Sequence, residues 1–330
     1  MKIQPYLVGS GRAGLALLKS LALLEMTDSE FEIQKFIKID RNRSLKNVKQ
    51  KDDEFSLLLI ANPHGLHAEK LLEAETENFD LIISEKPICT TLSEVSKLKE
   101  LKTPLAVCHG YRQSWGVQKL KSMIDAGAFG EIISIEGRYW QSSTAQRVLE
   151  NKAAQSWKND PKLSGPYDVL LDIGTHWVDT AIFLLRNKPI ETKLWLSYVN
   201  AEAKHRDSHV HLSMNFENGT HALASISKTV HGATNHFEVN IIGAKKFATW
   251  KFLDADRIEI GEGNSTTYLS RSDSELGSKQ GPYHATGWLE GYIEIIRQSL
   301  LHTTGKKFQA YPDLNDSIRV METLLNAQHL

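Results

Sequence analysis

The stretch YLVGSGRAGL, residues 6–15, decides the fold. A short apolar run ends in Gly9-Ser10-Gly11-Arg12-Ala13-Gly14, which fits G-x-G-x-x-G and opens a helical pattern. In such a turn the first glycine permits the tight bend, the second lets a pyrophosphate approach, and the third lets helix and strand pack closely. The helix N-terminus then faces the phosphate charge. The sequence therefore predicts a dinucleotide-binding turn, with cofactor contacts from Gly9, Gly11, Arg12, Ala13 and Gly14.

Short apolar runs alternate with helical patterns through the rest of the first third of the chain. Near-continuous runs such as Leu57-Leu58-Leu59-Ile60 are typical of parallel strands covered on both faces. Proline is tolerated best at the first residue of a strand, so Pro5 limits the first strand on its N-terminal side, and we expect this strand over residues 6–9. A capping-box spacing at Thr91-Leu92-Ser93-Glu94 indicates a helix start. The expected strands are 6–9, 36–40, 55–61, 80–85 and 105–109, and the expected helices are 11–26, 64–77 and 92–101. This order predicts a Rossmann domain, a doubly wound parallel α/β sheet, over residues 1–113.

After about Gln113 the pattern changes to a run of strands with few crossover helices. Hairpin turns are expected at Asn218-Gly219 and at Gly243-Ala244-Lys245. The expected helices are 115–125, 172–185, 287–301 and 314–329, and strands are expected at 132–140 and between 193 and 260. We therefore predict an α+β domain with a large, mostly antiparallel open sheet over residues 114–330, whose C-terminal helix can pack back on the first domain.

Composition limits the class of protein and its compartment. The 330 residues are 41% hydrophobic and 24% charged, which excludes collagen-like and largely disordered chains. With 39 Lys and Arg against 40 Asp and Glu, the chain lacks the basic charge that nucleic-acid binding requires. The longest apolar run, 15–24, contains Lys19 and Ser20 and is too short to span a membrane. Two cysteines, Cys89 and Cys108, are too few for a disulfide framework, so we expect two free thiols and a cytoplasmic protein. Together with the neutral charge and the short apolar runs, this composition predicts neither nucleic-acid nor membrane partners.

The end of the second predicted strand should bind the adenosine ribose. Asp40 lies there, 31 positions after Gly9, and a carboxylate at this place hydrogen-bonds the ribose diol of NAD. Arg41 and Arg43 follow and could instead accept the 2′-phosphate of NADP. We favour NAD and leave NADP open. Only about 14 residues separate Asp40 from the third strand, so the usual second helix should be shortened or absent.

Three further residues have the chemistry of proton transfer. Lys86 follows the fourth predicted strand, at the sheet edge where open parallel sheets bind ligands, although a surface lysine would fit as well. Asp172 and His176 are four residues apart and share one face of the predicted helix. An imidazole titrates near neutrality and a carboxylate fixes its tautomer, which suits the pair to general acid–base catalysis. A buried histidine satisfied by its neighbour is the alternative.

Six of the 13 histidines lie between His205 and His236, but strand alternation accounts for them without a metal. Over residues 209–216 the even positions are apolar, and the odd positions, including His209 and His211, share a polar face. We therefore expect no metal site. Candidate substrate contacts are Arg112, which has motif support, and Arg138, Arg147 and Tyr283, which have none. Trp140 and Trp157 could line a substrate cleft or equally pack in a core.

Five segments, by their order and spacing, resemble the glucose–fructose oxidoreductase, inositol dehydrogenase and MocA family of NAD(P)-dependent oxidoreductases, over essentially the whole chain. The segments are Ala61-Asn62-Pro63-His64-Gly65-Leu66-His67, Glu85-Lys86-Pro87, His109-Gly110-Tyr111-Arg112, the stretch from Trp157 to Gly165, and Asp172-Ile173-Gly174-Thr175-His176. The glycine turn is common to Rossmann proteins and adds little. The family's glycine cluster before the aspartate is reduced here to Gly165-Pro166-Tyr167, so the floor of the pocket should differ.

The resemblance implies a Rossmann domain followed by a substrate-binding domain whose open sheet forms a homodimer or homotetramer interface. It also implies a mechanism in which His176 takes the proton of a substrate hydroxyl while hydride passes from that carbon to nicotinamide C4. Lys86 would hydrogen-bond the same oxygen, and Asp172 would position or share protons with this pair. The peptide bond before Pro87 is expected to be cis. Cofactor contacts implied by the resemblance are Asn62, Pro63, His64, His67, Glu85, Lys86, Pro87 and Arg112.

These features favour an NAD(P)-dependent dehydrogenase or reductase that acts on a hydroxyl or keto carbon of a sugar, cyclitol or related polyol. Two alternatives stay open. A glycosidase with tightly held NAD would oxidise its substrate transiently and show no net cofactor reduction. A sensor would bind a dinucleotide without turnover, and it would have no need of a proton-handling histidine.

Overall fold

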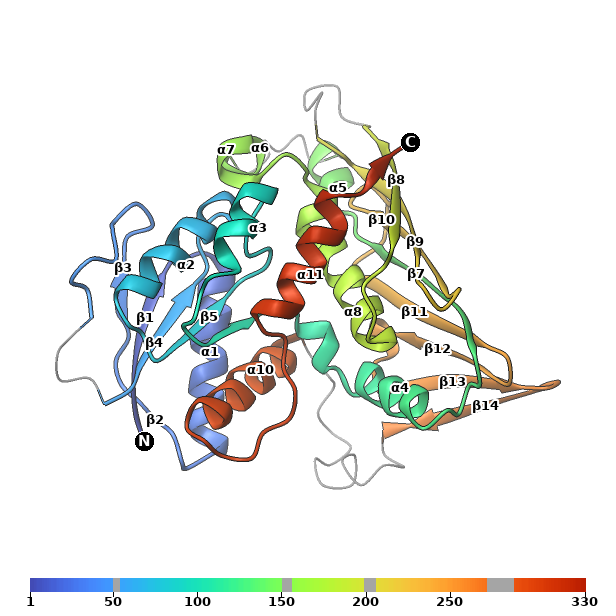
Figure 1. Ribbon diagram of the computed structural model, residues 1–330, viewed down its shortest axis with the longest axis horizontal. Helices are drawn as coiled ribbons and strands as arrows, with labels where there is room; N and C mark the ends of the chain where they lie inside the picture. Colours follow the sequence, from blue (N-terminus) through green and yellow to red (C-terminus); the bar gives the residue numbers. More distant parts are fainter. Residues whose placement is uncertain (50–53, 150–155, 199–205, 272–287) are drawn as a thin grey trace. The chain divides into compact units, whose positions relative to one another are not determined.

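The structure, a computed structural model of the chain, describes residues 1–49, 54–149, 156–198, 206–271 and 288–330 (Figure 1). Two compact units make up the chain. The first comprises residues 1–113, 160–165 and 288–322, and the second comprises residues 114–159, 166–287 and 323–330. The glycine turn and Lys86 therefore belong to the first unit, and Asp172 and His176 belong to the second.

The first unit is built on a six-stranded sheet in the order β2-β1-β4-β5-β6, in which β3 also pairs with β1. Each of these pairings is parallel, so the predicted Rossmann sheet is confirmed. The strands are β1 (Lys2–Val8), β2 (Glu32–Ile33), β3 (Ile37–Ile39), β4 (Ser56–Ile60), β5 (Leu81–Ser84) and β6 (Leu105–Val107). Because β1 lies between β3 and β4, the strand order reverses beside β1, at the switch point where such sheets bind ligands.

Helices cover both faces of this sheet. On one face, α1 (Arg12–Thr27) and α10 (Trp288–Thr303) share a core that includes Leu17, Leu59 and Ile296. α2 (His67–Thr76) packs on β4 and β5 outside that core and contacts α3 (Leu92–Leu98), which begins with the predicted capping box of Thr91 and Glu94. The shorter turns are η1 (His64–Leu66), η2 (Gly110–Gln113) and α7 (Pro161–Ser164), and α11 (Leu314–Leu325) follows α10.

β1 begins before Pro5, whereas the sequence predicted that it would begin after this residue. Pro5 lies at a gap in the sheet, because β1 pairs with β2 through residues 2–3 and with β3 only from residue 6. Gln4 donates its backbone N–H to the carbonyl of Phe55 on the β4 side, so the next residue faces the gap. No ladder hydrogen bond is lost there, and the strand tolerates proline inside it.

Between β3 and β4 the described residues, 40–49 and 54–55, contain no helix, in agreement with the shortened or absent second helix that the spacing after Asp40 predicted. Residues 41–48 form turns in which Leu45 is buried, and its N–H donates to the carboxylate of Glu73 on α2 (3.0 Å). This stretch is therefore held by α2 and does not cover the sheet with a helix of its own.

The second unit is built on a nine-stranded sheet in the order β14-β13-β12-β11-β7-β10-β9-β8-β15 (Figure 1). The strands are β7 (Ile132–Trp140), β8 (Glu191–Ser197), β9 (His209–Asn215), β10 (His221–Ser227), β11 (His236–Gly243), β12 (Phe247–Lys251), β13 (Arg257–Glu262), β14 (Ser265–Ser270) and β15 (Gln328–His329). The predicted antiparallel sheet is confirmed with two exceptions, since β10 is parallel to β7 and β15 is parallel to β8. Both predicted hairpins are present, β9–β10 and β11–β12.

Two helices, α4 (Trp115–Asp125) and α8 (Thr175–Leu185), lie along one face of this sheet, where Trp177 and Trp250 are fully buried (Figure 1). On β9 the apolar residues are buried while His209 and His211 face the opposite side, as the alternation predicted. Apolar side chains thus hold these two helices against one face of the sheet. No described helix covers the other face.

Three helical segments differ from the sequence prediction. The helix predicted over 314–329 ends at Leu325, and Gln328–His329 form β15 instead. The polar stretch 141–165, for which the sequence predicted no helix or strand, contains α5 (Ser143–Leu149), α6 (Ser156–Asn159) and α7. The helix predicted over 172–185 begins instead with a π-helical turn, Leu170–Gly174, and continues as α8. Such turns are rare, are frequent at functional sites, and have no sequence period by which they could be predicted.

Candidate functional site

The glycine turn lies at the carboxyl end of β1 and opens α1. Gly9 has φ +90°, and a Cβ there would lie 2.5 Å from the carbonyl carbon of Ala61, the residue after β4. A Cβ on Gly14 would overlap the carbonyl oxygen of Gly9. At Gly11, by contrast, an added Cβ would meet nothing of the chain within 4 Å. The fold itself therefore requires the first and third glycines, and the second leaves space at the N-terminus of α1, where backbone N–H groups can bind a pyrophosphate.

Charged residues near this turn are exposed. Arg12 lies in the first turn of α1 next to Ala13. Asp40 directly follows β3, which pairs with β1, and its Oδ1 accepts the N–H of Asn42 at 2.9 Å. Arg41 is exposed as well. The residues predicted to meet the ribose and its phosphate are thus accessible at the carboxyl edge of the sheet.

The loop after β4 contains a buried amide that the protein leaves unsatisfied. Asn62 is 6% exposed, and neither its Nδ2 nor its Oδ1 has a hydrogen-bond partner in the described part of the chain. Because an unsatisfied buried amide is costly, this arrangement points to a ligand that completes its hydrogen bonds. Pro63 is buried next to it, and His64 is half-buried in η1.

His67 contacts the protein backbone, whereas the sequence predicted a cofactor contact. Its ring is fully buried, with Nδ1 2.6 Å from the carbonyl oxygen of Pro87 and Nε2 2.8 Å from that of Asn62. Burial lowers the pKa of His67, and the two carbonyls only partly oppose this effect. The imidazole therefore ties the loop after β4 to the loop after β5, and both of its nitrogens are engaged.

Lys86 follows β5 and is 8% exposed. The Lys86–Pro87 peptide bond is cis, as the resemblance implied. The preceding residue is fixed from α10, because Tyr292 donates its hydroxyl to Oε1 of Glu85. Burial, and then the charge of Glu85, raises the pKa of Tyr292 well above its ordinary value. The chain around Lys86 is thus fixed by Tyr292 before it and by His67 after it.

Arg112 also has a partner within the first unit. It is 4% exposed, and its Nη1 lies 2.5 Å from Oδ2 of Asp316 on α11. His109 is buried nearby, and burial, followed by the charges of Arg112 and Lys86, lowers its pKa well below the ordinary value. The guanidinium predicted to contact a cofactor therefore anchors the segment after β6 to α11.

In the second unit, two lysines and two aspartates form an ion-pair network at the start of α8. Asp172 lies in the π-helical turn, and its Oδ2 is 2.8 Å from Nζ of Lys158 on α6. Lys228, directly after β10, pairs with the same oxygen and lies 2.8 Å from Oδ1 of Asp168. The four-residue spacing of Asp172 and His176 thus includes a π-helical turn, not the regular α-helical turn that the sequence predicted.

His176 lies in the first turn of α8 and is half-buried. The centroid of its ring is 6.1 Å from that of Tyr139 on β7, whose hydroxyl accepts a hydrogen bond from Gln141 at 3.1 Å. Arg138 points to the opposite face of the sheet, where it pairs with Glu238 (2.8 Å) and stacks on Trp140. Strand alternation therefore separates Arg138 and Trp140 from His176.

The remaining predicted substrate contacts are placed only in part. The ring of Trp157 lies beside its neighbour, with Nζ of Lys158 5.4 Å from the ring centroid. The side chain of Arg147 and the whole of Tyr283 lie outside the described residues.

Sequence reasoning missed several residues that organise these loops, namely Lys228, Asp168, Asp207 and Tyr292. One of them had a readable signal. In β10, Ala222, Ala224 and Ile226 are buried, and the same alternation carries Lys228 to the buried face. A lysine in that position requires a carboxylate partner. Tyr292 had none, since its partner Glu85 lies 207 positions away.

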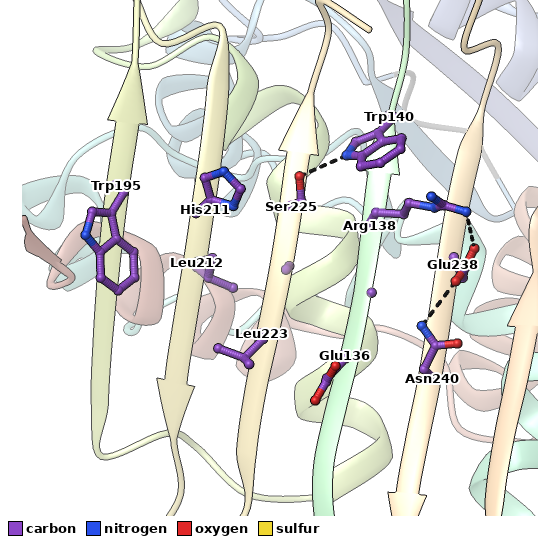
Figure 2. A pocket seen from close by; sticks show the side chains of 12 residues that line it. Glu136, Arg138, Trp140, Trp195, His211, Leu212, Leu223, Ser225, Glu238 and Asn240 are labelled. Atoms are coloured by element: carbon purple, nitrogen blue, oxygen red, sulfur yellow. Dashed lines mark hydrogen bonds and ion pairs between the residues drawn. The ribbon is translucent and has the colours of Figure 1, made fainter.

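The face of the second sheet without helices contains a groove of about 440 Å³. Figure 2 shows Trp195 on β8, Leu223 on β10 and Trp140 on β7 along it, and Trp140 donates its Nε1–H to Ser225 at 2.9 Å. Among the described residues, no group of three or more His, Cys, Asp or Glu side chains is arranged to hold a metal ion. Within the same ranges, every helix is too short or too polar to cross a membrane.

The fold defines a two-unit Rossmann protein with a large mixed sheet in its second unit. Residues 117–247 match the sequence model of the GFO/IDH/MocA C-terminal domain. The second unit thus matches a GFO/IDH/MocA C-terminal domain, in agreement with the resemblance found in the sequence.

Curated relatives and solved structures agree with this family. An uncharacterized oxidoreductase, YfiI, of Bacillus subtilis (strain 168) is 27% identical over 303 residues, which are 84% of this chain and 76% of that protein. Levoglucosan dehydrogenase of Pseudarthrobacter phenanthrenivorans is 24% identical over 63% of this chain and 58% of its own length. An inositol dehydrogenase homolog from Azotobacter vinelandii, solved with NAD+, has a TM-score of 0.84 at 20% identity and covers 99% of this chain and 94% of that one.

Proposed function

We propose that the chain is an NAD-dependent oxidoreductase that transfers a hydride between nicotinamide and a hydroxyl or keto carbon of a sugar, cyclitol or related polyol. The observation that carries this proposal is the carboxyl edge of the first sheet, where the open glycine turn, the unsatisfied Asn62 amide and buried Lys86 follow β1, β4 and β5. The names of the relatives, an oxidoreductase and a levoglucosan dehydrogenase, support the same class of reaction.

The residues at this edge fit a nicotinamide dinucleotide. The backbone N–H groups at the N-terminus of α1, beside Gly11, can bind the pyrophosphate. The side-chain amide of Asn62, which has no hydrogen-bond partner in the described part of the protein, can form hydrogen bonds with the bound dinucleotide. Asp40 can accept hydrogen bonds from both hydroxyls of the adenosine ribose, and its negative charge would repel a 2′-phosphate. We therefore expect NAD to be preferred over NADP. When bound, NAD supplies or accepts the hydride at its nicotinamide ring. The solved structures of inositol dehydrogenase homolog with NAD+ and levoglucosan dehydrogenase with NADH support this choice.

The chain's own residues would manage the proton. His176 takes the proton from the substrate hydroxyl during oxidation and returns it during reduction, as the resemblance implies. Lys86 hydrogen-bonds the same oxygen and favours the negative charge that develops on it. Asp172 forms ion pairs with Lys158 and Lys228. Its role in the proposed reaction is therefore to remain an ionised carboxylate that orients these two ammonium groups.

A second copy of this chain is the partner that we propose for the face of the second sheet without helices. Trp195 on β8 and Leu223 on β10 are 44% and 45% exposed on this face, with β9 between the two strands. Large apolar side chains on one face favour protein association, and the groove in Figure 2 lies between them. This agrees with the homodimer or homotetramer that the resemblance implies.

Binding and turnover measurements test the proposed reaction. NADH and then NADPH are titrated by energy transfer from tryptophan, and a panel of polyols, sugars and glycosides follows with the preferred cofactor. We expect NADH to bind more tightly and at least one polyol to be oxidised. Lys86→Met and His176→Ala should each lower kcat by about 100- to 10 000-fold, whereas His209→Ala, on the opposite face of the second sheet, should keep wild-type turnover.

Three results would contradict the proposal. Full turnover by the Lys86→Met and His176→Ala variants would contradict the assigned roles. Hydrolysis of a glycoside without net cofactor reduction would show the NAD-dependent glycosidase instead. Binding of NADH without turnover of any compound in the panel would indicate the dinucleotide sensor.

A further inference from the structure

The ion-pair network of the second unit contains two lysines that differ in accessibility. The side chain of Lys228 is 3% exposed, whereas that of Lys158 is 27% exposed. Both ammonium groups pair with Oδ2 of Asp172, and Lys228 also pairs with Asp168. Lys228 is therefore enclosed by the protein, and Lys158 is the member of the pair that a ligand can reach.

The backbone beneath the network is fixed independently. Asp207 is 1% exposed and accepts the backbone N–H groups of Asp168 (2.5 Å) and Leu170 (2.6 Å), which enter the π-helical turn. Asp168 and Asp172 consequently reach Lys228 from one short, rigid segment. A rigid carboxylate shared by two ammonium groups fixes the position of both.

The two amines respond to this arrangement in opposite ways. Burial alone would lower the pKa of Lys228, but the carboxylates of Asp172 and Asp168 outweigh it, and the pKa is raised. Asp172 raises the pKa of Lys158, but burial and the charge of Lys228 together outweigh that effect, and the pKa is lowered. As the pH rises, Lys158 is therefore the first of the two to lose its proton.

We propose that Lys158 binds an oxygen of the substrate and that Lys228 is a positioning residue, which acts through Asp172 to hold Lys158 in place. The inference rests on the proposed function, because it takes the ligand of this unit to be a polyol. An ammonium group donates hydrogen bonds and accepts none, so Lys158 selects a hydroxyl or carbonyl oxygen. The two lysines face Asp168 and Asp172, with Asp207 beneath them, so the network has no spare positive charge and favours an uncharged substrate over an acid.

Site-resolved amine labelling tests the coupling without any substrate. The full-length protein is acetylated at a series of pH values, and mass spectrometry gives the midpoint of labelling at Lys158, with exposed Lys251 as an internal reference. We expect Lys158 to label at a lower pH than Lys251. In Lys228→Met its midpoint should rise by about one pH unit, because a neighbouring positive charge is gone. In Lys228→Arg, which keeps the charge, the midpoint should stay at the wild-type value.

A second variant guards against loss of folding. Lys228→Met leaves Asp168 without its ammonium partner, whereas the double variant Lys228→Met/Asp168→Asn removes one charge of each sign. Circular dichroism checks that both variants are folded. In the double variant the midpoint should rise by less than in Lys228→Met, because the charge of Asp168 raises the pKa of Lys158 and its effect is smaller than that of Lys228. A Lys158 midpoint that does not rise in a folded variant of either kind would overturn the proposal.

Kinetics with a turned-over polyol tests the substrate contact. Lys158→Met should lower kcat/KM about 10- to 100-fold, the loss of one hydrogen bond from a charged donor, and Lys158→Arg should recover part of it. The alkaline limb of the kcat/KM profile should move to higher pH in Lys228→Met, which a merely structural lysine would not cause. Wild-type kcat/KM in Lys158→Met would refute the contact while leaving the proposed function intact. If no polyol were turned over, the proposed function would fail, and the labelling shift would still support the coupling between Lys228 and Lys158.

Discussion

Single residues in the glycine turn separate what the fold requires from what a ligand requires. Gly14 packs against the carbonyl oxygen of Gly9, so Gly14→Ala should destabilise the protein by about 1–3 kcal/mol through overpacking. Gly11 has nothing of the chain within 4 Å of an added Cβ, and its φ of −74° suits alanine. Gly11→Ala should therefore keep the wild-type melting temperature and weaken NADH binding roughly 10-fold or more, because the new methyl occupies the approach of the pyrophosphate.

Melting curves and NADH titrations of the two variants measure this difference. Equal NADH affinity in Gly11→Ala and wild type would show that no dinucleotide approaches the backbone there. A large drop in melting temperature in Gly11→Ala would show that the space seen beside this residue does not exist in solution.

Residues that belong to a short local motif were easier to predict from the sequence than residues whose partners lie far away in the chain. Lys86 follows a strand and stands in a short motif, so its place at the sheet edge was predictable. The hydroxyl that fixes Glu85 comes from α10, and no local pattern connects the two. His67 shows the other side of this limit: its motif predicted a ligand contact, and the two backbone carbonyls that contact its ring, which the motif did not predict, belong to loops brought together only by the folded sheet.

At the scale of elements, hydrophobic periodicity predicted most strands and helices, and the deviations have physical causes. α4 and β7 have the predicted bounds because their patterns are long and regular. Pro5 is inside β1 because its neighbours β2 and β3 leave a gap, and a gap between other strands cannot be seen in the strand's own sequence. The π-helical turn at 170–174 depends on Asp207 and the ion pairs of Asp172, which come from other elements.

The sheet face of the second unit makes an element-scale prediction about assembly. Leu223 on β10 is 45% exposed beside the groove, so Leu223→Glu should place a charge within the proposed interface between two copies. We expect sedimentation velocity to show an oligomer for the wild type and a shift toward monomer for Leu223→Glu. The matched control is Leu92→Glu, which changes a 41% exposed leucine in α3 of the first unit and should leave the oligomer intact. A monomeric wild type would refute this interface.

For the whole molecule, composition and charge excluded several classes of protein, and the order of strands predicted the fold of each unit. Both cysteines are free and buried, as two thiols outside any disulfide framework were expected to be. Substrate identity was not predictable, because the groups that meet a ligand come from several elements at once. Lys158, Lys228 and Asp172 show this, since they lie on α6, after β10 and before α8.

The pH dependence of stability follows from buried histidines of the first unit. Burial lowers the pKa of both His67 and His109 from the ordinary value of 6.5. Unfolding exposes these rings, so below about pH 6.5 the unfolded chain binds protons that the folded chain refuses. Their contribution to stability is therefore complete above pH 6.5 and is lost as the pH falls below it. Between pH 7.5 and pH 5.5 each histidine should remove at most about 1.4 kcal/mol from the free energy of unfolding.

Urea unfolding at pH 7.5 and 5.5 measures this loss in the wild type and in His67→Gln. The variant gives up the tie between the loops after β4 and β5, so it should be less stable at both pH values. It also lacks one of the two buried rings, so its stability should fall less than that of the wild type between the two conditions, by at most about 1.4 kcal/mol. An equal fall in both proteins would mean that His67 takes up its proton in the folded state. In that case the two backbone carbonyls, and not burial, would determine the charge of this ring.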